Sequence, residues 1–315
     1  MATINPTEGN VVAGDQRPEE TIGFIGMGHM GLPMAANLVR AGRHVLGFDL
    51  VPAARVRAAE AGIRVVDAVT DAADASTVIT MLPSGAHVHD AYASGLLDAA
   101  RPGTMFLDCS TISVADAARA HDLAVAAGHR SVDAPVSGGV GGAEAGTLSF
   151  MVGGDPADHA AVSPLLSEMG AKIFHCGPPG SGQAAKICNN MILGVSMLAV
   201  SEAFVLAEKL GLAHQAMFDV VASSSGACWS LTSYCPVPGP VPTSPANHDY
   251  RPGFATALMA KDLSLAAEAV RANDVDGPVG LLAEEIYRRY RDEFGGGDDF
   301  SAIVTDIRAR SAGDS

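Results

Sequence analysis

A lysine and an asparagine stand four positions apart in the segment GQAAKICNN, residues 182–190. On a helix this spacing places Lys186 and Asn190 on one face, a turn apart. The residues around them are small or apolar, and desolvation at an apolar junction between a helix and a sheet lowers the pKa of a lysine. Lys186 is therefore a candidate for proton transfer near neutral pH, and Asn190 for orienting the same substrate. The alternative is a surface lysine whose stem lies along the helix with its charge in water.

A second polar cluster follows the end of an expected strand in DAPVSGG, residues 133–139. In an open α/β sheet, ligands bind beyond the carboxyl ends of the strands. Ser137 supplies a hydroxyl, and Gly138 and Gly139 leave backbone N–H groups unobstructed, so the combination suits a carboxylate. A turn rich in serine and glycine with no ligand is the alternative for the same residues.

A pattern of the form GxGxxG lies between an expected strand and an expected helix. The first glycine makes the tight turn, the second lets the backbone approach a pyrophosphate, and the third allows close packing of the helix on the sheet. The helix N-terminus then faces the phosphates. The six residues of this predicted cofactor turn are Gly26, Met27, Gly28, His29, Met30 and Gly31.

Asp49 ends the second expected strand, 23 positions after the first glycine of the cofactor turn. A carboxylate there accepts hydrogen bonds from ribose hydroxyls and repels a 2′-phosphate, so the sequence favours NAD over NADP. Arg55, six residues further on, keeps NADP open as an alternative.

Further candidates lie in the C-terminal half. Lys261 and Asp262 stand together in ALMAKDLSLA and are expected to form an exposed charged pair, whereas Trp229 is expected in the core. Between them, residues 236–245 read PVPGPVPTSP, and five prolines exclude a helix or a central strand. We expect a long loop inside the C-terminal domain that covers a site, in preference to an interdomain linker.

The elements that must position these residues follow from the hydrophobic pattern of residues 21–182. Short apolar runs alternate with segments of helical spacing. Strands are expected in TIGFIG, HVLGFD, STVITML, GTMFLD, SVDAPV, TLSFMVGG and AKIFHCG. Helices are expected over residues 29–41, 52–61, 92–100, 114–127 and 156–168. This alternation predicts an α/β fold, a Rossmann-type, doubly wound and mostly parallel sheet with helices on both faces.

The strand signal ends after Gly182, and residues 183–210 form one expected helix that is too long for a crossover. The rest of the chain is mostly helical in pattern. The sequence thus predicts a disordered tail over residues 1–20, a Rossmann-type domain over 21–182, and an all-helical domain for substrate binding and oligomerisation over 183–315. The tail has neither a secretory apolar segment nor the basic, acid-poor character of a transit peptide.

Composition limits the class of protein. The 315 residues carry 20 Lys+Arg and 35 Asp+Glu, a formal net charge of −15. This balance disfavours a general nucleic-acid binder and a binder of anionic membranes, because both need basic patches. Charged residues interrupt the longest apolar helical stretch, residues 191–212, so no membrane span is expected. The five cysteines form neither a CxxC pair nor a zinc-type cluster with histidine, which predicts reduced thiols, a cytoplasmic location and no metal site.

Together these segments resemble the β-hydroxyacid dehydrogenase family, from about residue 21 to near residue 307. The resemblance rests on GFIGMGHMG, DAPVSGGVGGAEAGTLSFMVGG, GQAAKICNN, CWS with the following PVPG, and FATALMAKDLSLA. DAPVSGG and GQAAKICNN are specific to the family, and CWS with PVPG points within it to 3-hydroxyisobutyrate as the substrate. His29 and His87 stand where relatives commonly have other residues, a departure that concerns cofactor affinity alone.

The resemblance implies a role for particular residues. Lys186 matches the catalytic proton donor and acceptor, and Asn190 matches the residue that holds the substrate. The positions that match the carboxylate-binding motif are Ser137, Gly138 and Gly139. Those that match cofactor contacts outside the glycine-rich turn are Leu82, Pro83, Thr111 and Lys261.

The implied activity is oxidation of 3-hydroxyisobutyrate to methylmalonate semialdehyde with NAD⁺, a step of valine degradation. The implied protein is a homodimer or homotetramer that takes a small β-hydroxy acid and binds neither nucleic acid nor a membrane. Two alternatives stay open. One is a tartronate semialdehyde reductase or another short-chain β-hydroxyacid dehydrogenase, and the other is a non-catalytic dinucleotide-binding module. Lys186 argues against the module, because some members of the superfamily lack the helix lysine.

Overall fold

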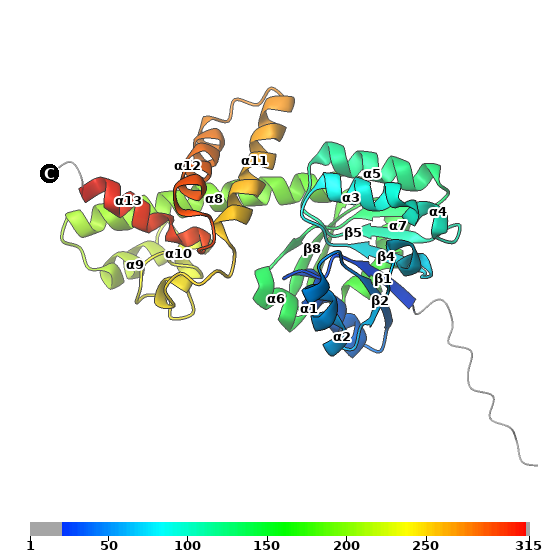
Figure 1. Ribbon diagram of the computed structural model, residues 1–315. Coiled ribbons are helices and arrows are strands. Elements are labelled where there is room, and N and C mark those ends of the chain that lie inside the picture. The colour runs from blue at the N-terminus through cyan, green and yellow to red at the C-terminus, as the bar shows by residue number, and fades with distance from the viewer. Residues whose placement is uncertain (1–20, 313–315) are drawn as a thin grey trace, which may run out of the picture.

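The computed structural model describes residues 21–312, and the expected tail over residues 1–20 lies outside them. An N-terminal lobe, built on a β-sheet, and a helical lobe are joined by one long helix, α8 (Ser181–Lys209). Figure 1 shows α8 running from the edge of the sheet through the helical lobe. The boundary expected after residue 182 falls in the first turn of this helix.

Within the described residues nine strands form one sheet, in the order β3-β2-β1-β4-β5-β6-β8-β7, with β9 paired to β8. They are β1 (Thr21–Ile25), β2 (His44–Phe48), β3 (Arg64–Val65), β4 (Thr77–Thr80), β5 (Met105–Asp108), β6 (Arg130–Asp133), β7 (Val136–Ser137), β8 (Leu148–Gly153) and β9 (Gly170–Gly177). The pairs from β3 to β6 are parallel, whereas β8 is antiparallel to β6 and β7 and parallel to β9. The expected Rossmann-type, mostly parallel sheet is confirmed.

The remaining elements are helical. Those of the N-terminal lobe are α1 (Gly31–Arg40), α2 (Pro52–Glu60), η2 (Val69–Ala73), α3 (Gly85–Ala91), the π-helical turn η3 (Tyr92–Leu96), α4 (Leu97–Ala99), α5 (Val114–Ala126), α6 (Gly139–Ala145) and α7 (Pro156–Leu166). After α8 follow α9 (His214–Ala222), α10 (Trp229–Thr232), η4 (Pro245–Asn247), α11 (Thr256–Ala272), α12 (Pro278–Phe294), η5 (Phe300–Ala302) and α13 (Ile303–Ala312).

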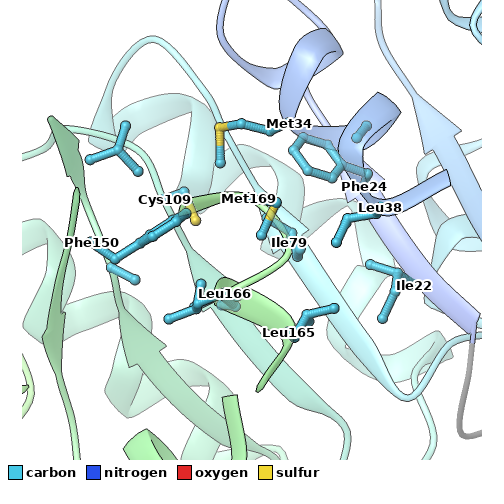
Figure 2. Packing of buried hydrophobic residues seen from close by; sticks show 14 of the residues in the cluster. Ile22, Phe24, Met34, Leu38, Ile79, Cys109, Phe150, Leu165, Leu166 and Met169 are labelled. Carbon is cyan, nitrogen blue, oxygen red and sulfur yellow. The ribbon is translucent and has the colours of Figure 1, made fainter. Parts of the chain in front are cut away.

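Each face of the sheet has its own core, because neighbouring strand residues point to opposite sides. Ile79 and Leu107 pack with α1, α6 and α7, whereas Val78 and Phe106 pack with α3, η3 and α5. Figure 2 shows the first of these clusters, in which side chains of α1 and α7 meet those of β1, β4 and β8. Burial on both faces explains why the inner strands are continuous apolar runs.

In the helical lobe, α8 packs against α11, α12 and α13. The proline-rich segment is a loop of this lobe, since its Val237 and Val241 join Phe204 of α8 and Val304 of α13 in one buried cluster. A hydrogen bond of 2.8 Å from the Tyr250 hydroxyl to the carbonyl of residue 236 fixes its start.

By length and hydropathy α8 could cross a bilayer, since an 18-residue window has a mean hydropathy of 1.8, contrary to the sequence expectation. Half of that window is buried inside the protein. Lys186, Asn190 and Ser201 are buried along the helix as well. These contacts make α8 the central packing helix of the helical lobe.

Candidate active site

The cofactor turn joins β1 to α1 and has no room for side chains on its inner side. Gly26 has a φ of +92°, and a Cβ at this residue would collide with the carbonyl oxygen of Met81. A Cβ at Gly31 would collide with the carbonyl oxygen of Gly26. At Gly28, by contrast, a Cβ would meet no atom within 4 Å, so the outer side of the turn is open. This cradle fits a pyrophosphate at the N-terminus of α1.

Asp49, beyond the end of β2, binds the backbone of the same turn. Its carboxylate accepts a hydrogen bond of 2.7 Å from each of the backbone N–H groups of Met27 and Val51. Each oxygen keeps lone-pair capacity for ribose hydroxyls. The Arg55 guanidinium donates to the Asp49 carbonyl and lies 4.9 Å from the ring centroid of Phe48. Asp49, which favours NAD, and Arg55, which keeps NADP open, thus lie side by side.

Four predicted cofactor positions meet across the two lobes. Leu82 and Pro83 follow β4, Thr111 follows β5, and Lys261 lies on α11. The Leu82 N–H donates to the Ser110 hydroxyl at 2.9 Å. The Lys261 ammonium donates to the carbonyls of Pro83 at 3.1 Å and Thr111 at 2.8 Å. The two loops are thereby held at the carboxyl ends of the strands, where nucleotides bind in such sheets.

Lys186 and Asn190 share one buried face of α8, with exposures of 7% and 1%. Burial is the main cause that lowers the pKa of Lys186, the nearby Lys261 lowers it further, and the Asp262 carboxylate opposes both. The Asn190 side-chain amide donates to the Asp262 carboxylate. Within residues 21–312 the Lys186 ammonium makes no hydrogen bond, so its proton is available to a ligand.

Asp262 is the site residue that the sequence analysis missed. The expectation of an exposed charged pair is wrong for this residue, which is 4% exposed. The helices α8 and α11 approach closely at Gly194, where a Cβ would lie 3.0 Å from the Leu263 side chain. That approach buries Asp262 against α8. Its spacing from the buried Met259 and Ala266 could have indicated the buried face.

The carboxylate-binding candidates form a turn between β7 and α6. Ser137 is half-buried, and Gly138 and Gly139 have φ angles of +136° and +62°. A Cβ at Gly139 would lie 3.1 Å from the carbonyl oxygen of Gly253, in the segment before α11. This turn therefore faces the helical lobe as well.

Trp229 does not lie in the core as expected, because its side chain is 52% exposed. Its indole stacks on Tyr234 with ring centroids 4.9 Å apart, and Tyr234 stacks on Phe300. The Tyr234 hydroxyl donates to Asp299 and also lies against Gly253. The Gly253 carbonyl in turn lies close to Gly139 in the candidate carboxylate-binding turn. The aromatic pair thus borders the junction of the lobes.

Other predicted features are peripheral. His29 lies at the rim of the cofactor turn, and the His87 imidazole pairs with the Ser84 hydroxyl at 2.7 Å. In the part of the chain that the structure describes, no cluster of three or more His, Cys, Asp or Glu residues could hold a metal ion.

Comparison with known proteins agrees with this geometry. Residues 21–177 match the NAD-binding domain of 6-phosphogluconate dehydrogenase, and residues 180–307 match the NAD-binding domain of NADP-dependent 3-hydroxyisobutyrate dehydrogenase. The fold and the site define an NAD-binding dehydrogenase. The chain belongs to the 3-hydroxyisobutyrate dehydrogenase family, which confirms the resemblance to β-hydroxyacid dehydrogenases.

Two relatives and one solved structure illustrate the likeness. A protein of Mycobacterium tuberculosis named probable 3-hydroxyisobutyrate dehydrogenase is 53% identical over 292 residues, covering 92% of this chain and 99% of the relative. A Pseudomonas aeruginosa protein named NAD-dependent L-serine dehydrogenase is 45% identical over 285 residues, covering 90% and 96%. The solved structure of the M. tuberculosis 3-hydroxyisobutyrate dehydrogenase with L-serine has a TM-score of 0.89 at 52% identity, covering 92% and 99%.

Proposed function

We propose that the chain oxidises 3-hydroxyisobutyrate to methylmalonate semialdehyde with NAD⁺. The observation that carries the proposal is the buried Lys186, which shares one face of α8 with Asn190 and makes no hydrogen bond within residues 21–312. Relatives of 41–53% identity bear the name of this dehydrogenase, which supports the choice of substrate.

Each residue of the site has its own role in the proposed reaction. Bound NAD⁺ supplies the hydride acceptor. Lys186 takes the proton of the substrate hydroxyl, and because burial lowers its pKa, a larger fraction of the amine is unprotonated near neutral pH. Asn190 holds the hydroxyl, and Asp262 fixes the Asn190 amide. Ser137 with the N–H groups of the following glycines holds the carboxylate, which orients the reacting carbon.

L-Serine is a second candidate substrate. It shares the β-hydroxyl and the carboxylate of 3-hydroxyisobutyrate and carries an ammonium group where the other has a methyl group. The relative named for L-serine dehydrogenation and the solved structure with L-serine favour this candidate. Tartronate semialdehyde reduction remains the alternative within the same class.

A substrate panel tests the proposal. Initial rates with 3-hydroxyisobutyrate, L-serine, glycerate and 3-hydroxypropionate are measured at the nicotinamide absorbance, each with NAD⁺ and NADP⁺. We expect the highest kcat/KM with 3-hydroxyisobutyrate and NAD⁺. A higher kcat/KM for L-serine or glycerate would replace the substrate proposal, and no turnover of any compound would favour the non-catalytic module.

We further propose a cytoplasmic homodimer or homotetramer that acts in valine degradation. Exposed apolar side chains on α8 and α12, among them Ile192, Leu206, Val279 and Leu282, support self-association. The net charge of −15 gives no reason to expect nucleic acid or an anionic membrane as a partner. Light scattering on the purified protein would give the oligomeric state, and a monomer would contradict this proposal.

A further inference from the structure

Gln183, in the first turn of α8, is a fully buried side chain to which the sequence analysis gave no role. Its amide nitrogen donates to the Ser110 carbonyl at 2.7 Å, and its amide oxygen accepts from the Ile112 N–H at 3.1 Å. One side chain therefore fixes the backbone on both sides of Thr111.

The same residue belongs to the catalytic face of α8. Gln183, Lys186 and Asn190 follow one another at spacings of three and four, which aligns them on a single side of a helix. All three are buried. A single helical turn, held by the hydrogen bonds of a 29-residue helix, separates the contact with residues 110–112 from Lys186.

The loop that Gln183 holds also connects the other predicted cofactor contacts. The Ser110 hydroxyl accepts from the Leu82 N–H, and the Thr111 carbonyl accepts from Lys261, which also binds the Pro83 carbonyl. Gln183 thus ties this group of residues to the helix that carries Lys186.

A second anchor of α8 provides a comparison. The buried Asp133 carboxylate accepts from the N–H groups of Gly180 at 2.7 Å and Gln183 at 2.9 Å. Asp133 thereby caps the start of α8 from β6, whereas the two hydrogen bonds to residues 110–112 come from the Gln183 side chain.

We propose that Gln183 is a positioning residue that sets the register between the cofactor-contacting loop at residues 110–112 and Lys186. The inference rests on the proposed roles of that loop and of Lys186. Hydride and proton leave neighbouring atoms of one alcohol, so the two groups that receive them must be held in a fixed relation. A misplacement of about 1 Å in such a site costs about 10²-fold in rate.

The test replaces the side-chain amide of Gln183 with an apolar group of similar volume. Gln183→Met removes both hydrogen bonds and leaves a buried carbonyl at Ser110 and a buried N–H at Ile112 without partners. We expect faster hydrogen exchange at the Ile112 amide in the ligand-free protein, an NADH dissociation constant raised about tenfold, and kcat lowered about 10²-fold. Asp133→Asn is the matched control, because it weakens the same helix start without altering the side chain that binds residues 110–112.

A third variant preserves the shape of the side chain and serves also where the methionine variant fails to fold. In Gln183→Glu the ionised carboxylate can accept from Ile112 but cannot donate to Ser110, whereas the protonated acid can do both. Its NADH affinity should therefore improve on acidification relative to that of the unaltered protein over the same pH range.

The outcomes are distinct. The proposal stands if Ile112 exchange and NADH affinity change in Gln183→Met and not in Asp133→Asn, and if acid restores NADH binding to Gln183→Glu. It is overturned if Gln183→Met matches the unaltered protein, if Asp133→Asn causes the same losses, or if Gln183→Glu shows no such recovery. Neither exchange nor NADH binding involves a hydroxy acid, so these results do not depend on the proposed substrate.

Discussion

Lys186 is buried, and within residues 21–312 its ammonium has no direct carboxylate partner of the kind that a structural buried lysine normally has. Lys186→Ala should lower kcat by at least about 10²-fold, because the group that accepts the hydroxyl proton is lost. NADH binding should change little. Steady-state rates and NADH titration measure both effects, with the exposed Lys209→Ala as the control on the same helix. Retention of most of kcat would remove Lys186 from the proton-transfer role.

Asp262 acts on the same proton through its charge. Its carboxylate raises the pKa of Lys186, against the lowering caused by burial. Oxidation of an alcohol needs the unprotonated amine, so kcat/KM should rise with pH through the pKa of Lys186. Asp262→Asn removes the opposing carboxylate, and the acid limb of the pH profile should move to lower pH. The control Asp276→Asn changes an exposed carboxylate and should not shift the acid limb of the pH profile. A shift to higher pH would contradict the charge argument.

Asp49 has two functions that mutation cannot separate fully. Its carboxylate accepts from the Met27 and Val51 N–H groups, and ribose binding is the role proposed for it. Asp49→Ser combined with Leu50→Arg should shift the ratio of kcat/KM values toward NADP⁺, because repulsion of the 2′-phosphate is replaced by attraction. Rates with both cofactors should fall, since the turn loses part of its support. An unaltered protein that already prefers NADP⁺ would refute NAD selection by Asp49, and Leu50→Arg alone isolates the contribution of the added charge.

At the scale of elements, the proline-rich loop is the candidate for a movable cover. It is anchored by Val237 and Val241, while Trp229 beside it is exposed at the junction of the lobes. We expect NAD⁺ together with a carboxylate analogue of the substrate to slow hydrogen exchange at residues 230–234 and 246–251 more than NAD⁺ alone does. Slower exchange would reflect closure that excludes water from the site. Equal exchange in the binary and ternary complexes would leave the loop a static part of the lobe.

The sequence predicts most elements of the N-terminal lobe because its strands are buried on both faces and its main helices have clear apolar spacing. The helix α3 was missed since only Gly85 and Val88 are buried on it. The glycine-rich α6 buries a single alanine and has low intrinsic helix propensity, and β3 has only two residues. Such segments form helices or strands because of tertiary contacts, which the local sequence pattern does not reveal.

The candidate site, like the fold, can be predicted from the sequence only in part. The cofactor turn and the Lys186–Asn190 pair can be predicted, because each depends on residues close together in sequence. The pairing of Asn190 with Asp262 spans 72 positions and depends on the close approach of α8 and α11 at Gly194. The role inferred for Gln183 likewise needs the loop at residues 110–112 to be placed in space.

At the scale of the whole molecule, the lobes have separate cores. The buried clusters of the sheet contain no residue of the helical lobe, and those of the helical lobe contain none of the sheet. Figure 1 shows α8 as the continuous element between them. Away from α8, the contacts between the lobes include the Lys261 hydrogen bonds and the close approach of Gly253 to Gly139. The two cores are therefore packed separately, and α8 joins them.

Lys261→Met tests this arrangement, because methionine keeps the apolar stem and loses the ammonium that binds the Pro83 and Thr111 carbonyls. Hydrogen bonds from a charged group are the stronger ones, so we expect the NADH dissociation constant to rise at least about tenfold. The melting temperature should change little, since neither core is touched. Lys261→Arg keeps a charged donor and should recover part of the affinity. NADH titration and thermal unfolding of the three proteins measure these effects. Wild-type NADH affinity in Lys261→Met would show that the bridge plays no part in cofactor binding, and a large fall in melting temperature would show that the lobes depend on each other for stability.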